Sequence, residues 1–199
     1  MIILGLTGSI AMGKTTVAKQ FAECGVAVCD SDKIVHALLG RRGEAVEKVA
    51  KLFPHALEGE IINRTLLGRE VFGQKGKLAA LEAILHPLVR KHQQIFIRRA
   101  RGRKKNIVVL DIPLLFETHA EKRCDYVVVV TAPAFLQRQR VLQRMHMTPE
   151  KLASILARQM PDSRKRKLAD FIVPTGMGKY YSLKAVRAIL QSLKKPVSC

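Results

Sequence analysis

Gly8, Gly13, Lys14 and Thr15 have the spacing of a nucleotide-phosphate loop. Four residues separate the two glycines, and the lysine and threonine follow directly, which gives the pattern G-x-x-x-x-G-K-[ST]. In such a loop, successive backbone N–H groups turn toward phosphate oxygens, and the N-terminus of the next helix adds its own N–H groups. The residues that we predict to bind the phosphates are Gly8, Ser9, Ile10, Ala11, Met12, Gly13, Lys14, Thr15 and Thr16.

Three side chains could manage the charge of the phosphates and of a metal ion. Lys14 can reach the β- and γ-phosphates, and the Thr15 hydroxyl can bind Mg²⁺. Asp111 ends the apolar run 106–112, which is the position of a Walker B aspartate that holds Mg²⁺. The alternative is a turn residue before Pro113, but the phosphate loop in the same chain favours the metal role.

Asp30 and Asp32 follow the apolar run 25–29 and flank Ser31. If the backbone stays extended through these residues, both carboxylates face the same side. The alternative is a helix N-cap, because Asp and Ser are preferred directly before a helical pattern such as KIVHALL. Both roles are compatible, with one aspartate capping the helix and the other facing a substrate.

Arg140 and Arg144 are spaced one helical turn apart, and Gln137 comes three residues before Arg140. A mobile helix that presents both arginines to a transferring phosphate would stabilise the developing charge and exclude water. A solvated basic helix face is the alternative. We predict an arginine-rich helical lid over residues 137–164.

Apolar, β-branched runs alternate with longer helical patterns along the chain. This alternation is typical of a parallel sheet that is covered by helices on both faces. Ligands of such sheets bind beyond the carboxyl ends of the strands, where the phosphate loop and both aspartate motifs fall. We therefore predict a single α/β domain of three layers over residues 1–199. The predicted strands are 1–6, 25–29, 106–112, 125–131 and 170–174.

Residues 59–105 interrupt the alternation with consecutive helical patterns, so we predict a helical insertion there. Within it, Pro87 disfavours helical geometry at His86, which predicts a break in the helix.

The chain carries 35 Lys and Arg against 16 Asp and Glu, a formal net charge of +19. This excess fits nucleic-acid binding or a basic surface around a polyphosphate site, and specific nucleic-acid binding is disfavoured because the basic runs lack interleaved aromatics. No apolar run approaches the ~20 residues that span a bilayer, and no basic segment of the kind found in signal peptides precedes the first strand. The cysteines form no C-x-x-C pair and fit a reducing, cytoplasmic location; they are Cys24, Cys29, Cys124 and Cys199.

Nine segments match, in order, the motifs of one enzyme family: ILGLTGSIAMGKTT, VCDSDKIVH, INRTLLGREVF, LEAILHPLV, VVLDIPLLFE, CDYVVVVTAP, QRQRVLQR, ILARQM and LADFIV. The chain resembles dephospho-CoA kinases. The resemblance implies a P-loop kinase fold with an acceptor-binding lobe at 59–105 and a lid over ATP. It also implies transfer of the γ-phosphoryl group of ATP to the 3′-hydroxyl of the ribose of dephospho-CoA, with Mg²⁺. The alternatives are another small-molecule kinase of nucleosides or nucleotides, and a nucleotide-dependent nucleic-acid-binding protein.

The resemblance also implies roles for individual residues. Asp32 corresponds to the second aspartate of the D-x-D motif, the presumed base. Gln137, Arg140 and Arg144 fall on the family's Q-x-x-R-x-x-x-R, which contacts ATP. The implied catalytic residues are Lys14, Asp32 and Arg140, the acceptor site includes Asp32, Arg64 and His86, and the metal ligands are Thr15 and Asp111.

Two positions depart from the family pattern. Ala11 replaces a frequent glycine, so the loop is expected to be stiffer and still to bind phosphate. Thr175 stands where many members carry Asn, which puts the adenine-side contact of that Asn in doubt. The sequence leaves the oligomeric state open between a monomer and a small homo-oligomer.

Overall fold

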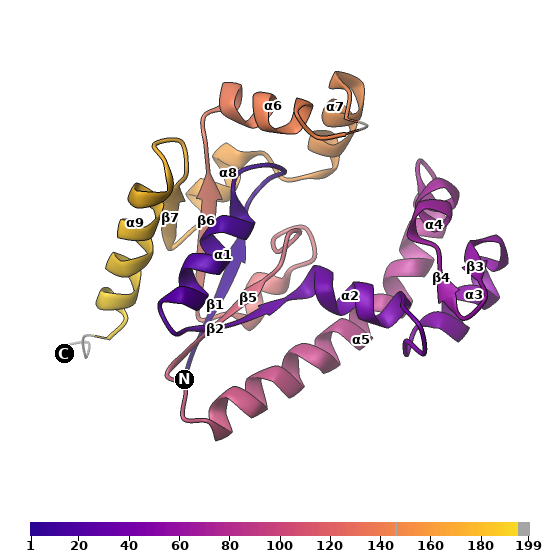
Figure 1. The fold of residues 1–199 in the computed structure, drawn as a ribbon, viewed down its shortest axis with the longest axis horizontal. Helices are drawn as coiled ribbons and strands as arrows, with labels where there is room; N and C mark the ends of the chain where they lie inside the picture. The colour runs from indigo at the N-terminus through magenta and orange to yellow at the C-terminus, as the bar shows by residue number, and fades with distance from the viewer. Residues whose placement is uncertain (146, 195–199) are drawn as a thin grey trace. The chain divides into compact units, whose positions relative to one another are not determined.

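The computed structural model describes residues 1–145 and 147–194, and the chain divides into two compact units (Figure 1). The first unit contains residues 1–29 together with the described residues from 100 onward, and the second contains residues 30–99. The second unit therefore begins before the predicted insertion at residue 59. Cys199 lies outside the described residues. Over the described part of the chain, no helix is both long and apolar enough to cross a membrane.

The first unit is built on a five-stranded sheet with the strand order β2-β5-β1-β6-β7. The central strand β1 pairs in parallel with β5 and with β6, and β6 pairs in parallel with β7. All five predicted strands are confirmed. They are β1 (Ile2–Thr7), β2 (Ala27–Asp30), β5 (Ile107–Asp111), β6 (Tyr126–Thr131) and β7 (Phe171–Pro174).

Alternate residues of the strands pack on opposite sides of the sheet. Leu4 and Leu6 of β1 lie in a buried cluster with side chains of α1 (Lys14–Glu23) and α9 (Lys179–Ser192), and these two helices lie side by side (Figure 1). Gly5 points the other way, where an added Cβ would lie 2.7 Å from Leu115 Cδ1. Close packing on this second side requires the glycine. The arrangement confirms the predicted three-layer α/β fold.

Helices α6 (Ala134–Leu142), α7 (Pro149–Arg158) and α8 (Asp162–Lys167) lie between β6 and β7 along the chain, and the short η2 (Ala120–Arg123) precedes β6. Because α6 ends at Leu142, the prediction of one helix that presents both Arg140 and Arg144 is wrong. The Thr148 side chain accepts a hydrogen bond from the Lys151 N–H and caps α7. Helix α7 begins directly after this cap, so it is a separate helix and not a continuation of α6.

The second unit has its own buried apolar cluster, which includes Leu38, Val49, Phe53 and Leu67. Its elements are mostly helical, with one short antiparallel hairpin. They are α2 (Ser31–Leu39), α3 (Val46–Leu52), η1 (Pro54–Ala56), β3 (Leu57–Glu58), β4 (Ile61–Ile62), α4 (Arg64–Val71) and α5 (Lys75–Gly102), whose last residues pass into the first unit.

Helix α5 runs without interruption through Pro87, so the predicted break at His86 is wrong. A proline inside a helix removes one backbone hydrogen bond and costs about 3 kcal/mol. Leu81 and Leu85 before the proline are buried, and Leu88 after it packs against the same cluster. Packing on both sides of Pro87 therefore outweighs the local preference.

Candidate active site

The phosphate loop joins β1 to α1, and its backbone has the conformation that such a turn requires. Gly13 lies directly before α1 with φ of 89°, in the left-handed region that glycine adopts without strain. At Gly8, a Cβ would lie 2.7 Å from the carbonyl oxygen of Val130. Ala11 also has a positive φ, 58°. This conformation explains the preference for glycine at that position and is accommodated here by alanine.

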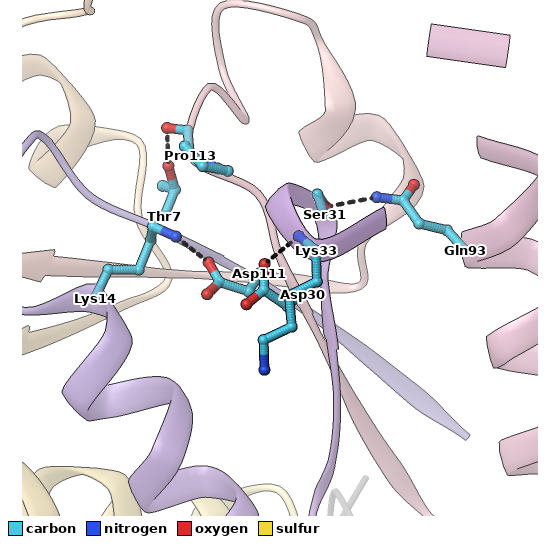
Figure 2. Close-up of polar contacts among 8 residues, drawn as sticks. All are labelled: Thr7, Lys14, Asp30, Ser31, Lys33, Gln93, Asp111 and Pro113. Atoms are coloured by element: carbon cyan, nitrogen blue, oxygen red, sulfur yellow. Dashed lines mark hydrogen bonds and ion pairs between the residues drawn. The ribbon is translucent and has the colours of Figure 1, made fainter. Parts of the chain in front are cut away.

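Lys14 and Asp111 meet at the carboxyl ends of β1 and β5, as Figure 2 shows. The Lys14 Nζ lies 2.5 Å from Oδ1 of Asp111, which is buried. Nearby, the Thr7 hydroxyl donates to the carbonyl oxygen of Pro113 at 2.9 Å and fixes the chain after β5. The structure thus brings together the predicted phosphate lysine and the predicted Walker B aspartate, while Thr15 is exposed in the first turn of α1.

Arg140 of α6 reaches the loop after β7. Its guanidinium donates to the Thr175 carbonyl oxygen at 2.8 Å and to the Thr175 hydroxyl at 3.1 Å. That hydroxyl lies 2.7 Å from the Met12 carbonyl oxygen, to which it donates, and the Thr175 side chain is buried. Thr175 thereby joins Arg140 to the phosphate loop. Arg144 is exposed and lies beyond the end of α6.

In the second unit, Asp30 and Asp32 have different surroundings. Asp30 is the N-cap of α2, and its carboxylate accepts from the Lys33 N–H at 3.1 Å (Figure 2). Because α2 begins at Ser31, the extended backbone ends before Asp32, and the two carboxylates do not share a strand face. The capping interpretation is confirmed for Asp30. Asp32 is exposed in the first turn of α2, and the Ser31 hydroxyl accepts from Gln93 Nε2 at 3.0 Å.

Arg64 lies in the first turn of α4, exposed and beside His36 of α2. The distance between Arg64 NH1 and His36 Nδ1 is 3.2 Å, so Nδ1 accepts from the guanidinium. His36 was not among the predicted site residues, although it ends the matched segment VCDSDKIVH. His86 is half-buried in the middle of α5.

Comparison with known proteins decides the family. A family model described as dephospho-CoA kinase matches residues 2–177. The chain belongs to the dephospho-CoA kinase family. A dephospho-CoA kinase from Mesorhizobium japonicum is 53% identical over 194 residues, which cover 98% of each chain.

Two solved structures extend this comparison. A crystal structure of a Thermus thermophilus protein has a TM-score of 0.85 and 34% identity, over 98% of both chains. A dephospho-CoA kinase from Campylobacter jejuni has a TM-score of 0.72 and 27% identity, over 96% of both chains. The activity of this chain is therefore that of a dephospho-CoA kinase: it uses ATP to phosphorylate dephospho-CoA in the last step of coenzyme A biosynthesis.

Sequence reasoning missed several residues that contact this kinase's phosphate loop or its neighbours. Thr175 was treated as a departure from the family, and Gln159 and Lys165 were given no role. Glu117 and Gln159 lie in the matched segments VVLDIPLLFE and ILARQM, which were the available signals. The contacts of these residues join segments that are far apart in sequence, so no local pattern reports them.

Proposed function

We propose that the phosphate loop, Lys14 and Asp32 carry the phosphoryl transfer in this dephospho-CoA kinase. The observation that supports the loop's role best is the contact of Lys14 with Asp111 at the strand ends, because it combines a phosphate-binding cation with a buried carboxylate. In the proposed step, the 3′-oxygen of the ribose attacks the γ-phosphorus, and the bond between that phosphorus and the β–γ bridging oxygen breaks. Asp32 accepts the hydroxyl proton, and ADP leaves with the bridging oxygen.

Thr15 and Asp111 are the residues that would hold Mg²⁺. A hydroxyl and a carboxylate are the oxygen ligands that this ion prefers, and it commonly takes only one or two protein ligands together with substrate phosphates. When bound, the ion would neutralise part of the phosphate charge. The described residues contain no group of three or more His, Cys, Asp and Glu side chains that could hold a metal ion by themselves.

We assign acceptor binding to Arg64, with His36 beside it, and to His86. A guanidinium and an imidazole are suited to the phosphate oxygens of dephospho-CoA. The segment 137–164, with Arg140 and Arg144, is proposed as the lid over ATP. Cys24 and Cys124 carry free thiols, which supports the proposed cytoplasmic location.

The decisive experiment is the release of ADP on addition of dephospho-CoA, compared with its 3′-deoxy analogue. The proposed step requires ADP release with dephospho-CoA and none above background with the analogue, since the attacking oxygen is missing. Equal release with both compounds would contradict transfer to the 3′-hydroxyl. Nucleosides and nucleoside monophosphates serve as the competing acceptors and should give no turnover.

A further inference from the structure

Lys165 is fully buried, although it lies in the basic run RKRK whose other members, Arg164, Arg166 and Lys167, are exposed. Its Nζ lies 2.9 Å from Oε1 of Glu117. A lysine is rarely buried without a partner, because removal of its charge from water costs several kcal/mol. Oε2 of Glu117 is also buried, and it has no hydrogen-bond partner among the described residues. Such an incompletely satisfied pair is a poor source of stability.

Glu117 fixes the backbone that leads out of α7. Its Oε1 accepts a hydrogen bond from the Met160 N–H at 2.7 Å, in addition to its contact with Lys165. We call residues 159–165 the return segment. This segment is held a second time where the Thr131 hydroxyl, at the end of β6, donates to Asp162 Oδ2 at 2.8 Å. Glu117 therefore anchors the return segment to the chain that follows β5, and Thr131 anchors it to the end of β6.

Gln159, at the start of the return segment, contacts the phosphate loop. Its backbone is extended after α7, with φ of −96° and ψ of 144°, and its Oε1 accepts from the Ile10 N–H at 3.0 Å. The Ile10 carbonyl oxygen accepts from Gln137 Nε2 of α6 at 2.9 Å. The N–H and the carbonyl group of Ile10 are thus both hydrogen-bonded to glutamine side chains. Gln137 and Gln159 lie near the two ends of the predicted lid segment, 137–164.

We propose that Glu117, whose buried charge is balanced by Lys165, is a positioning residue that holds Gln159 against Ile10 and so fixes the phosphate loop for nucleotide binding. Glu117 holds the Met160 N–H, and Met160 is the next residue after Gln159, so the anchor sets where the Gln159 side chain can reach. A loop that is already fixed loses less conformational entropy when it binds phosphate. This inference rests on the proposed role of residues 8–16 in binding ATP.

The first test replaces Gln159 with methionine, which keeps the length of the side chain and removes the acceptor. We expect Q159M to bind MgADP about fivefold to tenfold more weakly by calorimetry, since one partly buried hydrogen bond to the phosphate loop is lost. The KM for dephospho-CoA and the melting temperature should stay near the wild-type values. The matched control is Q191M, which makes the same change at an exposed glutamine of α9 and should bind MgADP normally. Wild-type affinity in Q159M would overturn the proposal.

The second test compares two uncharged replacements of the ion pair. E117Q/K165M keeps an oxygen that can accept from the Met160 N–H, whereas E117L/K165M removes it. We expect weaker MgADP binding in E117L/K165M only, and no further loss when Q159M is added to it, because both changes act through the same contact. Equal affinity of the two double variants, or additive losses, would contradict the positioning role. Lys14→Ala distinguishes failure of the proposed phosphate loop from failure of the positioning role. If this variant leaves the MgADP affinity unchanged, the assignment of residues 8–16 to ATP binding fails.

Discussion

The ammonium of Lys14 and the carboxylate of Asp111 lie 2.5 Å apart, although 97 residues separate them in sequence. Both groups lie at the carboxyl ends of neighbouring parallel strands, and Asp111 is buried. The Lys14 ammonium therefore pairs with a carboxylate of the protein and is also available to bind phosphate oxygens. Removal of the Lys14 side chain takes a positive charge away from the phosphate site and removes this ion pair from the buried Asp111 carboxylate.

Lys14→Ala should lower kcat by at least ~100-fold, because a cation aimed at the transferring phosphate is lost. It should also lower the free energy of unfolding by about 1–3 kcal/mol, because Asp111 loses a charged hydrogen-bond donor. Steady-state kinetics and urea unfolding measure the two effects. Lys19→Ala, an exposed change on the same helix, is the control and should alter neither. Near-normal kcat in folded Lys14→Ala would refute the loop assignment.

Thr175→Val should raise the KM for ATP several-fold. Valine has nearly the same shape as threonine, but it lacks the hydroxyl that joins Arg140 to the Met12 carbonyl oxygen. Thr175→Ser keeps the hydroxyl and should retain most of the wild-type affinity. If the serine and valine variants show the same KM for ATP, the hydroxyl has no part in positioning Arg140.

Asp32→Asn should lower kcat by ~10²–10⁴-fold at saturating Mg²⁺, since asparagine cannot accept the proton of the 3′-hydroxyl. Binding of dephospho-CoA should be largely kept. Asp30→Asn is the matched control, because asparagine caps helices as well as aspartate does and should preserve the cap of α2. A larger loss of turnover in Asp30→Asn than in Asp32→Asn would reverse the assignment of the two carboxylates.

Pro87→Ala should raise the free energy of unfolding by about 1–2 kcal/mol. Alanine restores the backbone hydrogen bond that proline removes inside α5, and the gain is partly offset by the greater freedom of the unfolded chain. Urea denaturation measures the change. Pro54→Ala is the control, because Pro54 stands at the start of η1, where proline is tolerated and no gain is expected. A loss of stability in Pro87→Ala would mean that the proline contributes packing that alanine cannot replace.

Cys124 should react slowly with iodoacetamide in the folded protein. Burial raises the pKa of its thiol to about 11 from an ordinary value of 9.0, and the Sγ donates to the Ala120 carbonyl oxygen. The thiolate is the reactive form, so at pH 8.5 the folded protein should be alkylated at Cys124 on the order of a hundredfold more slowly than the protein in urea. The rate should rise as the pH approaches 11, because the thiolate then forms. Mass spectrometry of the Cys124 peptide measures both rates, and equal rates at pH 8.5 would contradict the raised pKa.

The sequence by itself determined the five strands of the sheet and the phosphate loop. A strand that is buried on both faces needs apolar residues at every position, so its signal is local and continuous, as in 106–112 and 125–131. The loop is also marked locally at Gly13, whose positive φ favours glycine. At Gly8 the requirement for glycine is the space beside the carbonyl oxygen of Val130. The cap of α2 at Asp30 was also predictable from local sequence, as one of two alternatives.

Only the tertiary structure decided which polar side chains meet. Lys165 reads as one more exposed charge in RKRK, yet it is buried against Glu117, and Thr175 supports Arg140 from 35 residues away. The continuity of α5 through Pro87 likewise depends on an apolar cluster assembled from several helices. The physical reason is common to these cases. Local sequence sets the preferences of the backbone, whereas the surroundings of a side chain depend on segments that the fold brings together from distant parts of the chain.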